Sequence, residues 1–195
     1  MIPTRVLLES ERRILSFRIL RAGLFDCDYM LHLNNAAYLT HSEYARWELC
    51  AYNGLMESMY KDKVNFVVGG TAIRYRREIR PVFRQFEVHT FVAHVDERHF
   101  WIYHTFRYPP GGSDPGRIRC QMVCQGLAIQ GRTVMDPRKY LVENVGIDAE
   151  LIDELLQAES SNTTMHDLMD KYLAMDEKFK EASAKDDEWI AKKNE

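Results

Sequence analysis

A short polar segment of this 195-residue chain carries the residue types that acyl transfer needs. The segment D-C-D-Y-M-L-H-L-N-N runs from Asp26 to Asn35 and holds two carboxylates, one imidazole and two carboxamides. A carboxylate can attack a carbonyl carbon or activate a water molecule, and an imidazole can donate or accept the proton that moves. We therefore predict that Asp28 and His32 act at a reacting carbonyl group.

The segment lies where a strand-like run gives way to a helix-like run. We expect a strand at residues 13–25 and one long helix at 36–53, with Asn34 or Asn35 as its N-cap and Gly54 just past its end. The first amides of a helix have no intrahelical partner, and the helix dipole adds partial positive charge there. The amides at the start of this helix are therefore candidates for an oxyanion hole.

Each polar residue of the segment also has a structural interpretation. Asp28 can cap a turn, His32 can satisfy backbone groups, and Asn34 and Asn35 are caps more often than catalysts. A capping role would still fix the amides that polarise a carbonyl group. Tyr38, one turn into the helix, is expected to pack at the mouth of the site with its hydroxyl group paired.

Glu43 is a further catalytic candidate on the same helix. A buried carboxylate is costly unless it is paired, and Arg46 follows three residues later. A salt bridge between Glu43 and Arg46 is therefore the alternative to catalysis. The apolar residues of this helix are spread around most of its circumference, which predicts a helix enclosed by other structure.

Beyond residue 63 the pattern changes to strands. We expect five of them, at 64–68, 71–80, 85–96, 98–108 and 117–130. A helix followed by consecutive long strands predicts an α+β fold in which a curved antiparallel sheet wraps the helix.

Composition is typical of a soluble globular protein, with 46% hydrophobic and 28% charged residues. No apolar run approaches the roughly 18 residues of a membrane helix. Glu9 and Glu11 argue against a signal or transit peptide, so we expect a cytoplasmic protein, with organellar targeting as the alternative. The four cysteines show no metal or redox spacing, and we expect no metal site.

Charge divides the chain in two. Of its 29 acidic and 26 basic residues, 14 and 6 lie from Ile147 onward, which leaves 15 acidic and 20 basic residues before it. We predict a domain at 1–146 and an acidic helical extension at 147–195. All arginines lie in the first part, and Arg74 and Arg76 share one face of an expected strand, where they are candidates for binding phosphates. The chain has no basic run, so we expect no nucleic-acid partner.

The extension contains an apolar stripe at helical spacing. Its members are Met165, Leu168, Met169, Tyr172, Met175 and Phe179. We expect this stripe to dock on the body of the protein or on a partner.

The motif at residues 26–38, D-x-D-x-x-x-H-x-N-N-x-x-Y, resembles that of the hotdog-fold thioesterases of the 4-hydroxybenzoyl-CoA type. It is most similar to the thioesterase superfamily member six group, and the resemblance covers about residues 10–145. The resemblance implies a hotdog fold, a homodimer or homotetramer, and an acyl-CoA or acyl-ACP substrate from lipid metabolism. It implies no cofactor other than the coenzyme A of the substrate.

The resemblance gives Asp28 the role of nucleophile or general base, and His32 and Asn34 match a pattern shared with plant acyl-ACP thioesterases. Those enzymes also use an asparagine where this chain has Met30, whose thioether cannot donate a hydrogen bond. A non-catalytic acyl-CoA or lipid-binding protein is therefore the alternative. A hotdog dehydratase is a third reading, which the motif spacing fits less well.

Overall fold

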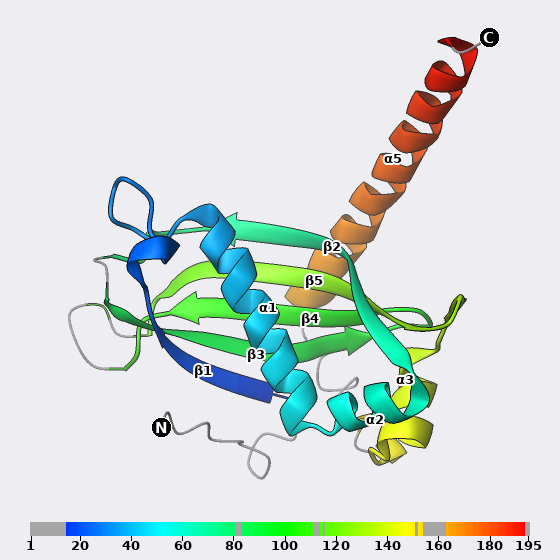
Figure 1. Cartoon of the computed structure of the whole chain (residues 1–195), viewed down its shortest axis with the longest axis horizontal. Helices are drawn as coiled ribbons and strands as arrows, with labels where there is room; N and C mark the ends of the chain where they lie inside the picture. The colour runs from blue at the N-terminus through cyan, green and yellow to red at the C-terminus, as the bar shows by residue number, and fades with distance from the viewer. Residues whose placement is uncertain are drawn as a thin grey trace. The chain divides into compact units, whose positions relative to one another are not determined.

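The computed structural model shows a long helix lying across one face of an antiparallel sheet (Figure 1). The structure describes residues 15–80, 83–110, 114, 116–150, 152–153 and 163–193. The strands are β1 (Leu15–Arg21), β2 (Val64–Tyr75), β3 (Gln85–Val95), β4 (Phe100–Arg107), β5 (Ile118–Gln130) and β6 (Thr133–Val134). The helices are η1 (Leu24–Asp26), α1 (Asn35–Tyr52), α2 (Leu55–Asp62), α3 (Pro137–Tyr140), η2 (Leu141–Val145) and α5 (Thr163–Lys193). The predicted α+β architecture, with its curved sheet, central helix and C-terminal helix, is confirmed.

The strands pair in the order β1–β3–β4–β5–β2, and β6 adds to the end of β5. Every pairing is antiparallel. β1 and β2 therefore form the two edges of the main sheet. β2 is the longer edge, with 12 residues, and its outer side presents backbone groups that no strand of the described chain pairs.

The predicted strands 64–68 and 71–80 are one strand, β2, which ends at Tyr75. Gly69 and Gly70, which separate the two predicted strands, form a β-bulge and not a break. The register to β5 shifts between Val68 and Gly70, and the strand then continues. The first strand also ends earlier than predicted, at Arg21, and the one-turn helix η1 fills the gap before the polar segment.

The boundaries of α1 agree with the capping residues in the sequence. The Asn34 side chain accepts a hydrogen bond from the Ala37 amide at 2.8 Å, which makes Asn34 the N-cap. At the other end Gly54 adopts φ = 75°, a left-handed conformation that separates α1 from α2. The two helices therefore meet at a fixed corner.

In the single chain, α1 is covered on one face rather than enclosed. Its buried residues are Ala37, Tyr38, His41, Ser42, Ala45 and Leu49. Leu39, Tyr44 and Trp47 lie on the other side and are between 44% and 50% exposed. The expectation of an enclosed helix is therefore wrong for one protomer, because the sheet reaches only the face that carries Ala37 and Leu49.

Aromatic residues form much of the core between α1 and the sheet. Phe86 and Phe106 stack with ring centroids 6.3 Å apart, and Phe66 meets Phe100 edge-on at 5.1 Å. Full burial of a side chain of this size contributes about 1.5–3 kcal/mol to stability. This packing fixes the position of α1, and hence of the polar segment before it.

The chain falls into two compact units, Met1–Leu156 and Gln157–Glu195. The boundary predicted after residue 146 stays a prediction, but Ile147 and Ile152 still pack with the core of the first unit. In the second unit α5 is 31 residues long, and its exposed face carries ion pairs such as Lys171–Asp167 at 2.7 Å. Docking of its apolar stripe stays a prediction. Among the helices in the described ranges, none has the length and apolarity to cross a membrane.

Candidate active site

The turn before α1 brings Asp28 and His32 together. Asp28 Oδ2 lies 3.0 Å from His32 Nδ1, and Oδ1 accepts a hydrogen bond from the Met30 amide at 2.9 Å. The Asp28 side chain is 29% exposed and that of His32 is 22% exposed. Asp28 therefore caps the turn, as its structural interpretation predicted, and its carboxylate is also paired with an imidazole and open to solvent. Met30 takes part through its backbone, which needs no particular side chain.

Asp26 has different partners from Asp28. One of its carboxylate oxygens accepts a hydrogen bond from the Gly23 amide at 2.9 Å and lies 3.4 Å from His41 Nε2. Burial lowers the pKa of His41, and the neighbouring Asp26 carboxylate opposes that shift. This second carboxylate–imidazole pair, Asp26 with His41, was not predicted from the sequence. Its only signal was that His41 lies seven residues after Asn34, on the same face of α1.

The first turn of α1 is held by the segment before it. The Asn34 amide donates to the Asp26 carbonyl at 2.8 Å, and the Leu33 amide donates to the Ile79 carbonyl at 2.9 Å. The cap uses the Ala37 amide, so the amides of Asn35 and Ala36 are the candidate donors to an oxyanion. Asn35 would contribute in this way through its backbone.

Tyr38 lies in the core and not at the mouth of a site. Its residue is 3% exposed, and its ring packs edge-on against Tyr75 and Phe106, with centroids 5.3 and 5.0 Å away. Burial raises the pKa of Tyr38, and a hydrogen bond to the backbone of Ile79 opposes the shift. Its ring therefore supports the first turn of α1 from the core, and a role for Tyr38 in substrate binding stays a prediction.

Glu43 pairs with Arg46, as the alternative predicted. Arg46 also reaches inward, where its Nη1 atom lies 3.2 Å from Cys124 Sγ and 3.5 Å from His104 Nε2. His104 is fully buried, and its Nδ1 atom lies 2.8 Å from Thr90 Oγ1. Burial, with a smaller effect from Arg46, lowers the pKa of His104 to about 3. The imidazole is therefore neutral at physiological pH.

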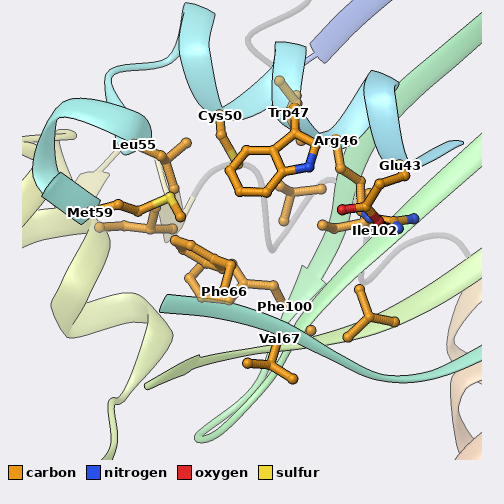
Figure 2. A pocket seen from close by; sticks show the side chains of 15 residues that line it. Glu43, Arg46, Trp47, Cys50, Leu55, Met59, Phe66, Val67, Phe100 and Ile102 are labelled. Carbon is orange, nitrogen blue, oxygen red and sulfur yellow. Dashed lines mark hydrogen bonds and ion pairs between the residues drawn. The ribbon is translucent and has the colours of Figure 1, made fainter. Parts of the chain in front are cut away.

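A cavity of about 640 Å³, including space open to solvent, lies between α1, α2 and the sheet (Figure 2). Trp47 and Cys50 bound it on the side of α1, and Phe66 and Phe100 lie across from them. Its other lining residues are Leu49, Leu55, Met59, Val67, Val68, Val92, Ile102, Gly126 and Leu141, with the charged pair Glu43 and Arg46. The lining is largely apolar, which suits a hydrocarbon chain.

The cavity and the polar turn occupy different parts of α1. Neither Asp28 nor His32 lines the cavity, whose first α1 residue is Glu43. Glu43 follows the N-cap Asn34 by nine residues, or about 13 Å along a helix. Burial raises the pKa of Cys50, in the cavity wall, to about 11, so its thiol stays protonated.

Arg74 lies on the face of the sheet that turns away from α1. It is the register partner of Gln121, whose side-chain amide donates to the Tyr103 hydroxyl at 2.6 Å. Tyr75, the next residue along β2, points to the α1 side instead, where its hydroxyl donates to the Asn35 carbonyl at 3.3 Å. Arg74 and the exposed Arg76 are therefore not brought next to Asp28 within the single chain.

Comparison with known proteins agrees with the fold and the motif. The model of the Thioesterase-like superfamily matches residues 23–158, so the chain belongs to this superfamily. The protein THEM6 of Danio rerio is 34% identical over 111 residues, which cover 57% of this chain and 52% of the relative. The chain thus spans about half the length of this curated relative.

Solved structures show the same fold at low sequence identity. The probable thioesterase YbaW from Escherichia coli aligns with a TM-score of 0.59 and 18% identity, over 67% of this chain and 96% of that protein. A DHNA-CoA thioesterase from Staphylococcus aureus aligns with a TM-score of 0.57 and 17% identity, over 76% and 94% of the two chains. The fold is therefore that of the hotdog thioesterases.

Proposed function

We propose that this protein hydrolyses an acyl-CoA or acyl-ACP thioester. The observation that carries the proposal is the Asp28–His32 pair, 3.0 Å apart and open to solvent, at the N-terminus of a helix that runs on past an apolar cavity. Membership of the Thioesterase-like superfamily and the thioesterase names of several structural neighbours support it. The reaction consumes water and yields a free acid and a thiol.

In the proposed reaction the thioester carbonyl lies at the first turn of α1. Asp28 attacks the carbonyl carbon, so that the C–S bond breaks, the thiolate leaves and water hydrolyses the resulting anhydride; in the alternative route Asp28 removes a proton from the water that attacks the carbonyl carbon. Asn34 holds the turn by its cap, and the amides of Asn35 and Ala36 stabilise the negative charge that develops on the carbonyl oxygen. His32, within hydrogen-bond distance of Asp28, carries the proton toward the departing thiolate.

The acyl chain is proposed to follow α1 into the cavity beyond Glu43. Glu43 then lies beside the substrate, where it is a second candidate for the catalytic carboxylate. Its pairing with Arg46 favours a positioning role over catalysis. A Glu43→Gln variant should therefore lose less kcat/KM than an Asp28→Asn variant.

We further propose that two protomers pair their sheets through β2. This edge strand is 12 residues long, and Val67 and Val68 at its middle are 44% and 40% exposed while also lining the cavity. A partner strand would satisfy the open backbone groups of this edge and cover that side of the cavity. Arg74 and Arg76 would then lie near the junction of the two sheets, where they stay candidates for binding phosphates of the substrate. We also propose a cytoplasmic location.

A thiol-release assay over short-chain, long-chain and aromatic acyl-CoAs tests the proposal. Thiol release above the uncatalysed rate for at least one substrate class is expected. The second candidate function is acyl-CoA binding without hydrolysis. Met30 favours it, because this residue stands where the plant acyl-ACP thioesterases have an asparagine. Tight acyl-CoA binding by isothermal titration, with no thiol release from any substrate, would support this second function and contradict the first.

A further inference from the structure

A second pocket, rich in arginine, lies where the ends of several strands converge. It is lined by Glu78, Arg80, Arg84, Tyr108, Asp114, Arg117 and Arg119, and it encloses about 770 Å³ including space open to solvent. We call it the arginine pocket. Four guanidinium groups face two carboxylates, so these side chains carry a net charge of +2.

The arginine pocket is a built structure and not a chance meeting of surface side chains. The Tyr108 ring lies between two guanidinium groups, with Arg84 Cζ 3.8 Å and Arg119 Cζ 4.1 Å from its centroid. Its hydroxyl donates to the Arg80 carbonyl at 2.9 Å and accepts from the Arg80 amide at 3.0 Å. Tyr108 is 4% exposed, so this arrangement is fixed by burial.

The carboxylates of the pocket balance only part of its positive charge. Asp114 pairs with both Arg117, at 3.1 Å, and Arg119, so one carboxylate serves two guanidinium groups. Glu78 pairs with Arg80 at 3.0 Å. The side chains of Arg80 and Arg117 are 64% and 61% exposed, and each can therefore turn toward a ligand. Guanidinium groups bind phosphate through two parallel hydrogen bonds.

The pocket adjoins the turn that holds Asp28 and His32. The Leu33 amide donates to the carbonyl of Ile79, which lies between two pocket residues, and the Ala22 amide donates to the Arg84 carbonyl. The backbone amide of Glu78 and the Arg80 guanidinium lower the pKa of Glu78, and His32 is close enough to contribute to the shift. A ligand bound in the pocket would thus have one end beside the proposed reaction centre.

We propose that the arginine pocket binds the phosphates of the nucleotide half of coenzyme A and so selects CoA thioesters over carrier-protein thioesters. The proposal rests on the thioesterase function above and names its substrate class. Coenzyme A carries a diphosphate and a 3′-phosphate, whereas the arm of a carrier protein carries a single phosphodiester. A pocket with four guanidinium groups and a positive surplus matches several phosphates better than one.

The test is isothermal titration of the full chain with coenzyme A, dephospho-CoA, 4′-phosphopantetheine and pantetheine at low ionic strength. The pocket variant is Arg80→Gln/Arg117→Gln, whose two exposed side chains contribute little to folding. The matched control is Arg98→Gln/Arg132→Gln, which removes the same charge from exposed positions at the opposite end of the strands. Thermal unfolding of both variants checks that they fold.

The pocket variant should bind coenzyme A about tenfold or more weakly than the wild type, since charge-assisted hydrogen bonds are lost. The control should stay within about twofold, the ordinary scale of screened surface charge. Pantetheine, which lacks phosphate, should bind both variants alike, and coenzyme A should bind the wild type more tightly than dephospho-CoA or 4′-phosphopantetheine does.

Four results would each overturn the proposal. Two concern the variants: wild-type affinity for coenzyme A in the pocket variant, or an equal loss of affinity in the control. Two concern the wild type: equal affinity for coenzyme A and 4′-phosphopantetheine, or no measurable binding of coenzyme A. The proposal for the arginine pocket and the proposed thioesterase function can fail independently of each other. Loss of binding in the pocket variant without thiol release by the wild type would leave the pocket standing and remove the thioesterase. Thiol release by the wild type, with unchanged coenzyme A affinity in the pocket variant, would overturn the pocket proposal and leave the thioesterase proposal standing.

Discussion

Two polar clusters lie along α1, and they differ in their access to water. The Asp28–His32 pair before the helix is between 22% and 29% exposed, whereas His104, under the middle of the helix, is fully buried. A substrate and its water can reach the first cluster without any opening of the fold. The second cluster is closed to substrate and water, and its neutral imidazole links the sheet to α1 through Thr90 and Arg46. Under the proposed function, similar residue types thus serve chemistry at one place and stability at the other.

The largest effect that sharpens this contrast is expected from His104→Ala. The variant leaves a cavity under α1 and removes the hydrogen bond to Thr90, so the free energy of unfolding should fall by about 3 kcal/mol. Urea unfolding measures this change. The folded fraction should keep kcat/KM close to that of the wild type. Normal stability combined with lost activity would place His104 in the chemistry and erase the contrast.

Acid should destabilise the protein through the same residue. The pKa of His104 is about 3 in the folded chain and near 6.5 when unfolded. Between these values the unfolded chain binds a proton that the folded chain does not, so the free energy of unfolding is highest above pH 6.5 and decreases as the pH falls toward 3. The loss should approach about 1.4 kcal/mol per pH unit below 6.5. Unfolding curves at pH 7 and 5.5 would show a smaller acid effect in a His104→Gln variant. Equal acid effects in both proteins would mean that His104 does not titrate in this way.

A smaller effect should follow from filling the cavity. Met59 lines it from α2, and Met59→Trp should shorten the space available to an acyl chain (Figure 2). We expect kcat/KM for long-chain acyl-CoAs to fall about fivefold, on the scale of about one buried methylene group, while short-chain values stay unchanged. A parallel loss for both chain lengths would argue that the chain does not lie in this cavity.

The fold could be predicted from sequence where local signals agree with the tertiary structure. Asn34 and Gly54 marked the ends of α1, and both act there as expected. The failure at β2 has a physical reason: Gly69 and Gly70 are equally suited to a turn and to a bulge, and only pairing with β5 decides between them.

The site was harder to predict because its parts come from distant segments. Asp28 and His32 lie within one turn, so the motif was enough to predict that both lie before α1, although their direct contact was not predicted. The pairing of Asp26 with His41 depends on how α1 sits on the sheet. The arginine pocket was not predicted at all, because it forms only when side chains from three separate segments meet: Glu78, Arg80 and Arg84, then Tyr108, then Asp114, Arg117 and Arg119.

The central claim, that chemistry occurs at the exposed cluster before α1, is tested most directly by the kcat/KM of Asp28→Asn over a panel of acyl-CoAs. Asp136→Asn is the matched control, because it makes the same change at an exposed N-cap where asparagine caps equally well. We predict a loss of about 100-fold or more for Asp28→Asn, the scale of a missing general base, and no change for the control. A loss of less than tenfold in a folded Asp28→Asn protein would contradict the account.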